Sequence, residues 1–380
     1  MRSEIRGTLL EALRHPDRAV AHVRCTMDNL GDRMVGQAIN HLLAPLVVVD
    51  YAPSRRIALA ARLARHGRLF RLTCLGGGTL IFGDIHRGWG AALQEALQRT
   101  AGAFSFGTGV IDPAFRDELH RRFGYSPLRP ESTTLWIECL ARFALISVRG
   151  RESERILRQH GLGNVEVVGD PSFYFARDRV APKPRARRIG LNVTDRSYFF
   201  ADAGRRVVEP FAALIRLLRA EGWQVTLFPM SPEDLPVTHA LLEQVGSQGL
   251  RVCLRYHAIH ELLDSIAEQD VFAGVRLHSV AAALCTYTPA IMIGYQPKNF
   301  ELMESVGMLE HCLRVDALDP EELFGRIEDL YEAIPLVQAR QFAACQALRG
   351  RLLAFRDRVH ALAGPGLAAP LAVAAAHERR

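Results

Sequence analysis

The feature that most constrains the fold is a regular alternation of short apolar runs with longer stretches of helical period. Runs rich in Val, Ile, Leu and Phe recur along most of the 380 residues, and an amphipathic stretch separates most of them from the next. Parallel strands need such crossovers, because a short turn cannot return the chain to the same end of a sheet. The sequence therefore predicts an α/β protein with parallel sheets covered by helices on both faces. The expected strands lie at residues 19–25, 46–51, 69–75, 103–109, 144–150 and 165–170 and, in a second series, at 188–193, 224–230, 250–254, 270–275 and 289–295.

The alternation divides the chain into two domains. It is interrupted by ARDRVAPKPRARR at residues 176–188, which gains proline and charge and loses the apolar period. We predict an N-terminal Rossmann-like domain over residues 1–175, a linker over 176–188, a C-terminal Rossmann-like domain over 189–335, and a helix with a partly ordered tail over 336–380. Such sheets bind ligands at the carboxyl ends of their strands, so the site is expected in a cleft between the domains. The expected helices lie at residues 29–43, 54–66, 89–99, 133–143, 151–161, 209–222, 236–246, 258–269, 279–287 and 320–362.

Composition excludes several classes of protein. The seven cysteines are scattered without a C-x-x-C pair, which argues against a disulfide framework or zinc knuckle and favours a reducing compartment. The charged N-terminus does not resemble a signal peptide, and the longest apolar runs are too short to span a membrane, so we predict a cytoplasmic protein. A net charge of +6 favours an anionic partner, either a phosphorylated substrate or, through peripheral association, an anionic membrane surface. No basic stripe is interleaved with aromatic residues, so nucleic acid is not an expected partner.

The stretch GVRLHSVAAAL at residues 274–284 carries the strongest candidates for chemistry. Arg276, Leu277, His278 and Ser279 fall at the carboxyl end of an expected strand, where a helix begins. A helix N-terminus presents unpaired N–H groups and the positive end of the helix dipole, which suits an anion. Arg276 would add a planar fork for a carboxylate or phosphate, and His278 would bind the same anion or transfer a proton. The structural alternative is that Arg276 pairs with an acid and His278 caps the helix.

Two further strand ends carry cationic candidates. Arg149 ends the run ALISVRG, and its alternative interpretation is a solvated loop arginine. Lys298 follows the strand that ends at Tyr295, and its ammonium would suit a phosphate oxygen.

A glycine triplet ends another expected strand. Gly76, Gly77 and Gly78 would either let the backbone approach a ligand closely or form a tight turn. The triplet does not match the dinucleotide pattern G-x-G-x-x-G, because Ile81 stands at the third glycine position.

The turn DNLGD at residues 28–32 is a further candidate. Asn29 and Asp32 could contact substrate, while the structural alternative is that Asp28 or Asn29 caps the following helix. His257 and His260 could share a helix face, but no carboxylate or cysteine stands at clear ligand spacing, so no metal site is predicted.

These motifs occur in an order that is found in a known protein family. In this order the chain resembles the polysaccharide pyruvyl transferase family, and G-x-R-x-H-S followed by Y-x-x-K is the most specific part of the match. The chain departs from many relatives at Gly150, where they carry an aspartate. The motifs are DNLGD, LGGGTL, SVRGRES, VVGDPSF, IGLNV, FAGVRLHSVAAAL and PAIMIGYQPKNFELMESVG.

The resemblance implies a fold similar to GT-B glycosyltransferases and a specific reaction. Members of the family move the enolpyruvyl carbons of phosphoenolpyruvate onto two hydroxyls of one sugar residue as a cyclic ketal, releasing phosphate. The implied acceptor is a sugar of an exopolysaccharide, capsule or cell-wall glycan, or of a lipid-linked oligosaccharide. The resemblance implies Arg149, Arg276 and His278 as ligands of phosphoenolpyruvate, with His278 the first candidate for proton transfer. No cofactor is expected besides the donor substrate.

Two other functions stay open from the sequence. A GT-B glycosyltransferase that uses a nucleotide sugar would need a ribose-binding carboxylate pair in the second domain, and no clear pair is present. A non-catalytic glycan-binding relative is disfavoured because both arginines, the histidine and the lysine are retained. The sequence does not indicate an oligomeric state.

Overall fold

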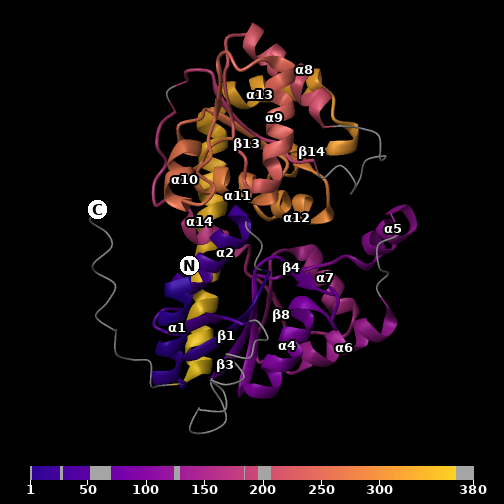
Figure 1. Ribbon diagram of the computed structural model, residues 1–380, viewed down its shortest axis with the longest axis vertical. Helices are drawn as coiled ribbons and strands as arrows, with labels where there is room; N and C mark the ends of the chain where they lie inside the picture. Colours follow the sequence, from indigo (N-terminus) through magenta and orange to yellow (C-terminus); the bar gives the residue numbers. More distant parts are fainter. Residues whose placement is uncertain are drawn as a thin grey trace.

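The protein consists of two α/β halves stacked along its long axis (Figure 1). The computed structural model describes residues 2–25, 29–51, 70–123, 129–183, 185–195 and 207–364. Each half has its own parallel sheet, so the predicted α/β class is confirmed. Between residues 176 and 187, no described residue belongs to a helix or strand. The predicted helix at 54–66 and the predicted tail after residue 364 lie outside the described residues.

The first half is built on a four-stranded parallel sheet of order β2-β1-β3-β5. Isolated bridges from Phe104 to Leu145 and from Thr108 to Val148 extend it toward the parallel pair β7–β8, and β4 pairs with β6 beside it. Strands β2 and β3 lie on opposite sides of β1, so the strand order reverses at β1. Open α/β sheets bind their ligands at such a reversal. The strands are β1 (Ala19–Val23), β2 (Val47–Asp50), β3 (Leu72–Gly76), β4 (Thr79–Ile81), β5 (Gly102–Phe106), β6 (Gly109–Val110), β7 (Ile146–Val148) and β8 (Val165–Val167).

The helices of the first half include two that the apolar period did not predict. Helix α5 replaces an expected polar stretch, and α1 precedes the first strand. Both have a negative mean hydropathy, so their polar residues obscured the apolar positions, such as Leu9, Ala12 and Leu13 of α1, that pack against the core. The helices are α1 (Arg2–Arg14), α2 (Leu30–Leu43), α4 (Gly88–Arg99), α5 (Pro113–Phe123), α6 (Pro130–Ala141) and α7 (Arg151–Gln159).

The second half is built on a six-stranded parallel sheet of order β11-β10-β9-β12-β13-β14. The order reverses between β9 and β12, which is where open α/β sheets of this order bind ligands. The short edge strand β14 was not predicted. The strands are β9 (Arg188–Asn192), β10 (Gln224–Leu227), β11 (Leu250–Val252), β12 (Val271–Gly274), β13 (Ala290–Gly294) and β14 (Cys312–Arg314). The helices are α8 (Val208–Ala220), α9 (Leu235–Val245), α10 (Ile259–Ala267), α11 (Leu277–Cys285), α12 (Pro297–Ser305) and α13 (Pro320–Glu332).

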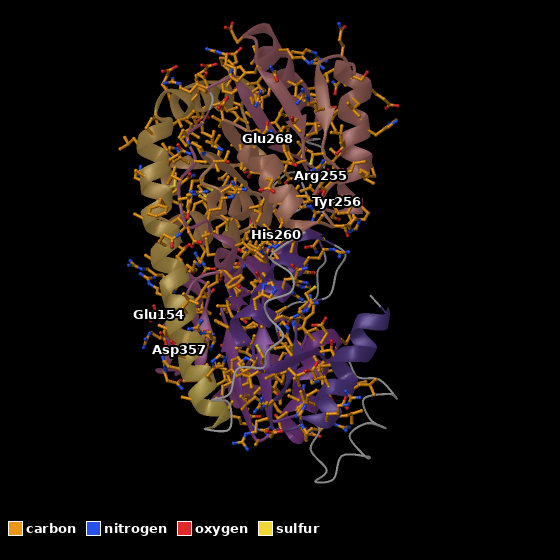
Figure 2. The ribbon with its side chains drawn as sticks, turned by 90° about the vertical axis from the view of Figure 1, so that its left-hand side faces the viewer. Glu154, Arg255, Tyr256, His260, Glu268 and Asp357 are labelled. Atoms are coloured by element: carbon orange, nitrogen blue, oxygen red, sulfur yellow. The ribbon has the colours of Figure 1, made fainter. Side chains whose placement is uncertain are left out.

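One long helix, α14 (Ile334–Ala363), packs against both halves. Figures 1 and 2 show it running along one side of the molecule, from α13 in the second half to α2 in the first. The Phe355 ring lies 5.1 Å from the ring of Phe106 at the end of β5, and His360 Nε2 lies 3.2 Å from the carbonyl oxygen of Leu43 at the end of α2. The C-terminal helix is therefore part of the structure of each half.

The apolar core is continuous across the junction of the two halves. Helix α2 packs against the short 3₁₀ helix η1 (Pro171–Phe175), and η1 packs against α11. Leu30 and Met34 of α2 consequently belong to the same buried cluster as Phe173 and Ala281. Full burial of a large apolar side chain contributes about 1.5–3 kcal/mol, so this cluster fixes the halves relative to each other. A separate cluster fills the other face of the first sheet.

Within the described ranges, no helix is both long enough and apolar enough to cross a membrane.

Candidate active site

A cavity of about 320 Å³ lies between the two halves, at the carboxyl ends of strands from both sheets. Its volume is typical of small-molecule sites at the lower end of their range. Ten of the twelve predicted site residues line it, whereas Gly76 and Gly77 do not. The ten are Asn29, Asp32, Gly78, Arg149, Arg276, Leu277, His278, Ser279, Tyr295 and Lys298.

Three helices begin at the wall of the cavity. They are α2 after Asn29, α11 after Arg276 and α12 after Gln296. Among the residues that the structure describes, no hydrogen-bond acceptor is present for the N–H groups of Leu277 and His278 in the first turn of α11. Such N–H groups and the positive ends of three helix dipoles favour an anionic ligand.

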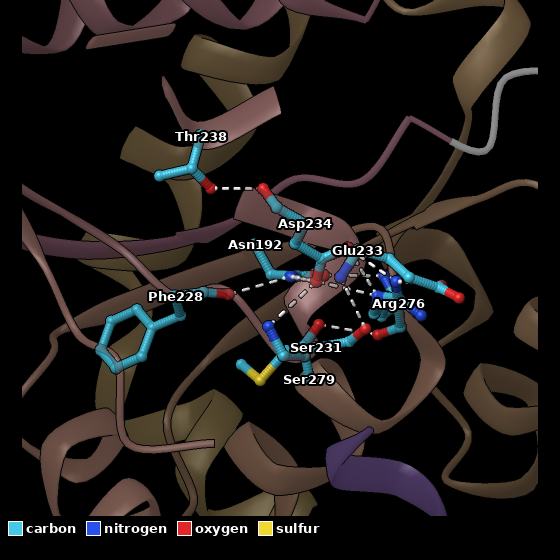
Figure 3. A network of polar contacts seen from close by, with 9 residues as sticks. Asn192, Phe228, Ser231, Glu233, Asp234, Thr238, Arg276 and Ser279 are labelled. Carbon is cyan, nitrogen blue, oxygen red and sulfur yellow. Dashed lines mark hydrogen bonds and ion pairs between the residues drawn. The ribbon is translucent and has the colours of Figure 1, made fainter. Parts of the chain in front are cut away.

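Arg276 is clamped by two carboxylates (Figure 3). Its Nε lies 2.8 Å from both carboxylate oxygens of Asp234, and its Nη2 lies 2.7 Å from Asp234 Oδ1 and 3.1 Å from Glu233 Oε2. Asp234 is fully buried and accepts a hydrogen bond from the Met230 N–H, while Asn192 accepts one from the Arg276 N–H. The pairing with an acid that the sequence left open is therefore present, and Arg276 also lines the cavity.

Arg149 is buried rather than solvated, with only 1% of its side chain exposed. Its Nη2 donates to Thr79 Oγ1 at 3.0 Å. Its other contacts are longer than hydrogen bonds, at 3.6 Å from Nη1 to Asp170 Oδ2 and 3.5 Å from Nε to Glu301 Oε2. Nε has no hydrogen-bond acceptor within the described part of the chain. The interpretation of Arg149 as a solvated loop residue is wrong, because the side chain is buried at the wall of the cavity.

Glu301 connects α12 of the second half to α7 of the first. Its Oε1 accepts a hydrogen bond from the Ser153 N–H at 2.8 Å. Gly150 makes room for this carboxylate, because a Cβ at position 150 would lie 2.7 Å from Glu301 Cδ. The departure from the family pattern at Gly150 thus coincides with a buried carboxylate that reaches in from the second half.

His278 lies between Asp170 and the start of α2. Its side chain is 16% exposed, and its Nε2 lies 3.5 Å from Asp170 Oδ2. On its other side the ring faces Gly31, where a Cβ would lie 2.7 Å from the His278 Cγ. Burial by itself would raise the pKa of Asp170, but the opposing effects of His278, Arg149 and the Ser172 N–H are larger, so this pKa is held well below its usual range.

The glycine triplet forms a tight turn. Gly77 and Gly78 have φ values of 77° and 75°, in the left-handed region that favours glycine. Val35 of α2 packs against Gly77, and Ile39 of the same helix packs against Gly76. Only Gly78 borders the cavity, so a close backbone approach to a ligand is restricted to that residue.

Asn29 caps α2 as the structural alternative predicted. Its Oδ1 accepts a hydrogen bond from the Asp32 N–H at 2.9 Å, and its Nδ2 donates to Asp32 Oδ2 at 3.1 Å. The other predicted cap, Asp28, lies outside the described residues. The Ser279 hydroxyl donates to the Arg276 carbonyl oxygen at 2.7 Å, which fixes the first turn of α11.

Lys298 projects its ammonium over an aromatic ring at the cavity wall. Its Nζ lies 5.2 Å from the centroid of the Tyr295 ring, within the range of a cation–π contact. In the described ranges no carboxylate forms an ion pair with Lys298, so its charge faces the cavity without compensation from a direct partner.

The first half adds an apolar wall to the cavity. Trp89 is fixed there by a hydrogen bond of 3.1 Å from its indole N–H to the Leu80 carbonyl oxygen. Aromatic rings of this kind suit the apolar face of a sugar ring. The wall consists of Leu80, Trp89, Val110, Ile111 and Phe115, with Asp112 and Arg116 at its polar end.

The described part of the chain holds no group of three or more His, Cys, Asp or Glu side chains arranged to bind a metal ion. His257 and His260 are both exposed, and Figure 2 labels His260 at the junction of the two halves.

Sequence reasoning missed the carboxylates that lie behind the cations. Asp170 belongs to VVGDPSF and Glu301 to NFELMESVG. Both segments are among the motifs of the family resemblance, and this membership could have marked the two carboxylates as candidates. Asp234 follows Glu233 in SPEDLP, which matches no motif, and its partnership with Arg276 depends on how the connection after β10 folds over β12.

The fold resembles those of solved glycosyltransferases. The glycosyltransferase of kitacinnamycin has 13% sequence identity and a TM-score of 0.51, and the match covers 91% of this chain and 99% of that one. A glycosyltransferase from Rickettsia africae ESF-5 has 8% identity and a TM-score of 0.52, with 91% and 98% covered. TarM has 9% identity and a TM-score of 0.47, and the match spans 77% of this chain but only 55% of TarM. Identities this low show the fold alone, and they confirm the predicted GT-B-like arrangement.

The sequence also matches the model of one protein family over residues 29–297, which is more than two thirds of the chain. The matched range begins at the cap of α2 and ends at the first residue of α12, so it includes Arg149, Arg276 and His278. This match agrees with the resemblance that the ordered motifs indicated. The chain belongs to the polysaccharide pyruvyl transferase family.

Proposed function

We propose that the protein transfers the enolpyruvyl group of phosphoenolpyruvate onto two hydroxyls of one sugar residue, forming a cyclic ketal and releasing phosphate. The observation that carries the proposal is the convergence of Arg149, Arg276 and His278 on one cavity, together with N–H groups of α11 for which the described residues offer no acceptor. Phosphoenolpyruvate carries a carboxylate and a phosphate. Two anionic groups on one small molecule match cations that come from both halves of the protein.

The donor is bound by groups that folding has already oriented. The Asp234 carboxylate fixes the guanidinium of Arg276, so little reorganisation is needed when an anion arrives. Arg149 lines the opposite wall of the cavity, and Lys298 adds a point charge beside the start of α12. Each charge-assisted contact of this kind is worth about 1.5–3 kcal/mol.

The reaction adds a proton to C3 of phosphoenolpyruvate and forms two new C–O bonds at C2. A proton is added to the methylene carbon C3, which becomes a methyl group, and C2 gains oxocarbenium character. One sugar hydroxyl attacks C2, and a second hydroxyl then replaces the phosphate oxygen as the C2–O bond to phosphate breaks. One of the two hydroxyl protons balances the proton gained by C3, and the other leaves with phosphate. We assign delivery of the proton to C3 to His278, whose imidazole lines the cavity beside Arg276.

The acceptor is a sugar residue of an exopolysaccharide, capsule or cell-wall glycan, or of its lipid-linked precursor. It would lie against the apolar wall that Trp89 and Phe115 form in the first half. This arrangement leaves the donor at the cationic side of the cavity and presents the sugar hydroxyls to C2 from the other side.

The experiment measures release of phosphate from phosphoenolpyruvate in the presence of candidate glycan acceptors, with release of nucleotide from sugar nucleotides as the counter-assay. The His278→Gln variant should keep its melting temperature but lose about 10²–10⁴-fold in kcat, the usual contribution of general acid–base catalysis. His257→Gln is the matched control, because His257 is exposed and lies outside the cavity lining. Nucleotide release without phosphate release, or wild-type turnover in folded His278→Gln, would contradict the proposal.

A further inference from the structure

The carboxylate of Asp170 is buried at the junction of the two halves with one oxygen left without a donor. Its side chain is 1% exposed, and Oδ1 accepts a hydrogen bond from the Ser172 N–H at 2.9 Å. Oδ2 has no hydrogen-bond partner among the described residues. A buried carboxylate oxygen without a donor is costly, so such an atom indicates a contact that forms at another stage of the working cycle.

Two nitrogens face Asp170 Oδ2, Arg149 Nη1 at 3.6 Å and His278 Nε2, and neither forms a hydrogen bond to this oxygen. His278 Nε2 lies 3.5 Å away, is buried, and has no hydrogen-bond partner among the residues described. Hydrogen bonds within an active site are often long before substrate binds and shorten in the complex. The two unsatisfied atoms therefore form a donor–acceptor pair that needs only a small movement to close.

The burial of Nε2 also limits how His278 can meet a ligand. An atom that is closed off from solvent on the Asp170 side cannot touch a molecule in the cavity. The ring has only one other nitrogen, Nδ1, and this atom is directed at Gly31, which lines the cavity at the start of α2.

We infer that Asp170 is a positioning residue that holds the Nε2–H of His278, so that Nδ1 is the nitrogen that meets the substrate. This inference rests on the proposed function in taking the substrate to be the phospho-enol donor. Asp170 comes from the end of the first half and His278 from the second, so the two halves must be in this relative arrangement for the imidazole to be held. A carboxylate on one ring nitrogen fixes the orientation of the ring and stabilises its protonated form.

The charges around the pair favour an ionised Asp170. Arg149 and His278 both face its carboxylate, and together with the Ser172 N–H they keep its pKa below the usual range in spite of burial, which acts in the opposite direction. Further titratable or charged groups near the pair include Cys285 on α11, Arg349 on α14 and Glu301 on α12, and Asp32, Arg276 and Lys298 line the same cavity as His278.

The first test determines which nitrogen of the His278 imidazole carries the proton in the protein without substrate. Nitrogen-15 NMR of histidine-labelled protein, with the His278 signals assigned from the His278→Gln variant, should show Nε2 protonated over the whole range in which the ring is neutral. A neutral ring protonated at Nδ1 would overturn the inference. This measurement needs neither a substitution at Asp170 nor turnover, so its result does not depend on whether the proposed reaction is correct.

The second test removes the charge on Asp170. Asp170→Asn keeps an oxygen for the Ser172 N–H, and it should move the midpoint of the His278 NMR titration to lower pH by about one unit or more. Asp170→Glu should restore part of that shift. Asp270→Asn is the matched control, because Asp270, just before β12, is equally buried and accepts hydrogen bonds from backbone N–H groups at the start of β9 without contacting His278. An unchanged midpoint in folded Asp170→Asn would refute the positioning role.

Steady-state kinetics add a readout that separates the two proposals. Asp170→Asn should lower kcat about 100-fold, the loss expected when a catalytic group is misplaced by about 1 Å, with a smaller change in the KM for phosphoenolpyruvate. His278→Asn, whose shorter amide reaches the position of Nδ1, should bind phosphoenolpyruvate more tightly than His278→Gln, whose amide reaches toward Asp170. The reverse order would overturn the assignment of Nδ1. If the wild-type protein does not turn over phosphoenolpyruvate but the NMR results hold, the proposed function fails and the positioning role remains.

Discussion

Substituting Gly31 by alanine should lower the activity of the protein with little change in its stability. Gly31 is the second residue of α2, and its φ lies outside the left-handed region, so alanine fits the backbone. The added Cβ would lie 2.7 Å from Cγ and 2.8 Å from Cε1 of the His278 ring, and closer still to Nδ1. Apolar contacts are comfortable at about 3.5–4.0 Å, so the ring would have to move by about 1 Å. The neighbouring cavity gives it room to do so.

The size of each effect follows from this displacement. A shift of about 1 Å in a catalytic group costs about 100-fold in rate, so kcat should fall by that factor. Alanine is a better helix former than glycine by up to about 1 kcal/mol, which offsets part of the cost of moving the ring. The free energy of unfolding should therefore change by no more than about 1–2 kcal/mol in either direction.

The assay pairs phosphate release from phosphoenolpyruvate with urea-induced unfolding. Gly325→Ala is the matched control, because Gly325 also lies within a helix, α13, and a Cβ there would meet no atom within 4 Å. It should gain helix stability and keep full activity. Wild-type kcat in a folded Gly31→Ala protein would refute the contact between α2 and His278 as a determinant of catalysis.

The remaining predictions concern the cations and the absence of a metal. Arg276→Lys should lower kcat/KM by about thirtyfold or more, because one ammonium cannot both pair with Asp234 and bind an anion; near-normal kinetics would contradict this role. Chelation by EDTA should leave turnover unchanged, and restoration of a lost activity by one divalent ion would disprove it. Burial lowers the pKa of Lys183 to about 7, so the folded protein loses this proton at lower pH than the unfolded chain. The free energy of unfolding should accordingly rise between about pH 7 and pH 10, a rise that Lys183→Met should lack in urea titrations.

The positions of the main candidates could be predicted because they depend on local sequence. A strand that ends where a helix begins is visible in the apolar period, and this boundary places Arg276 and His278 at the carboxyl end of β12. The glycine turn after β3 is equally local, because Gly77 and Gly78 adopt a backbone conformation that other residues avoid.

The environments of these residues could not be predicted, because they depend on contacts between distant segments. Arg149 follows its strand as expected, but its burial results from Thr79 in the glycine-rich connection and from Glu301 in the other half. Gly31 looked like an ordinary residue of a capped turn, and its contact with His278 exists only because α2 and α11 meet. Sequence patterns describe one element at a time, whereas these contacts belong to the junction of the two halves.

The continuous core and the path of α14 have a consequence for how the protein unfolds. Two Rossmann-like sheets joined by a linker would ordinarily be expected to melt as two independent units. Here the apolar face of α2 is covered by η1 and by the C-terminal helix α14. Separating the second half from the first would therefore expose part of the apolar core of the first half. The two sheets should therefore form one cooperative unit with a single calorimetric transition. Cleavage within residues 176–187 would leave fragments that associate instead of two autonomous domains.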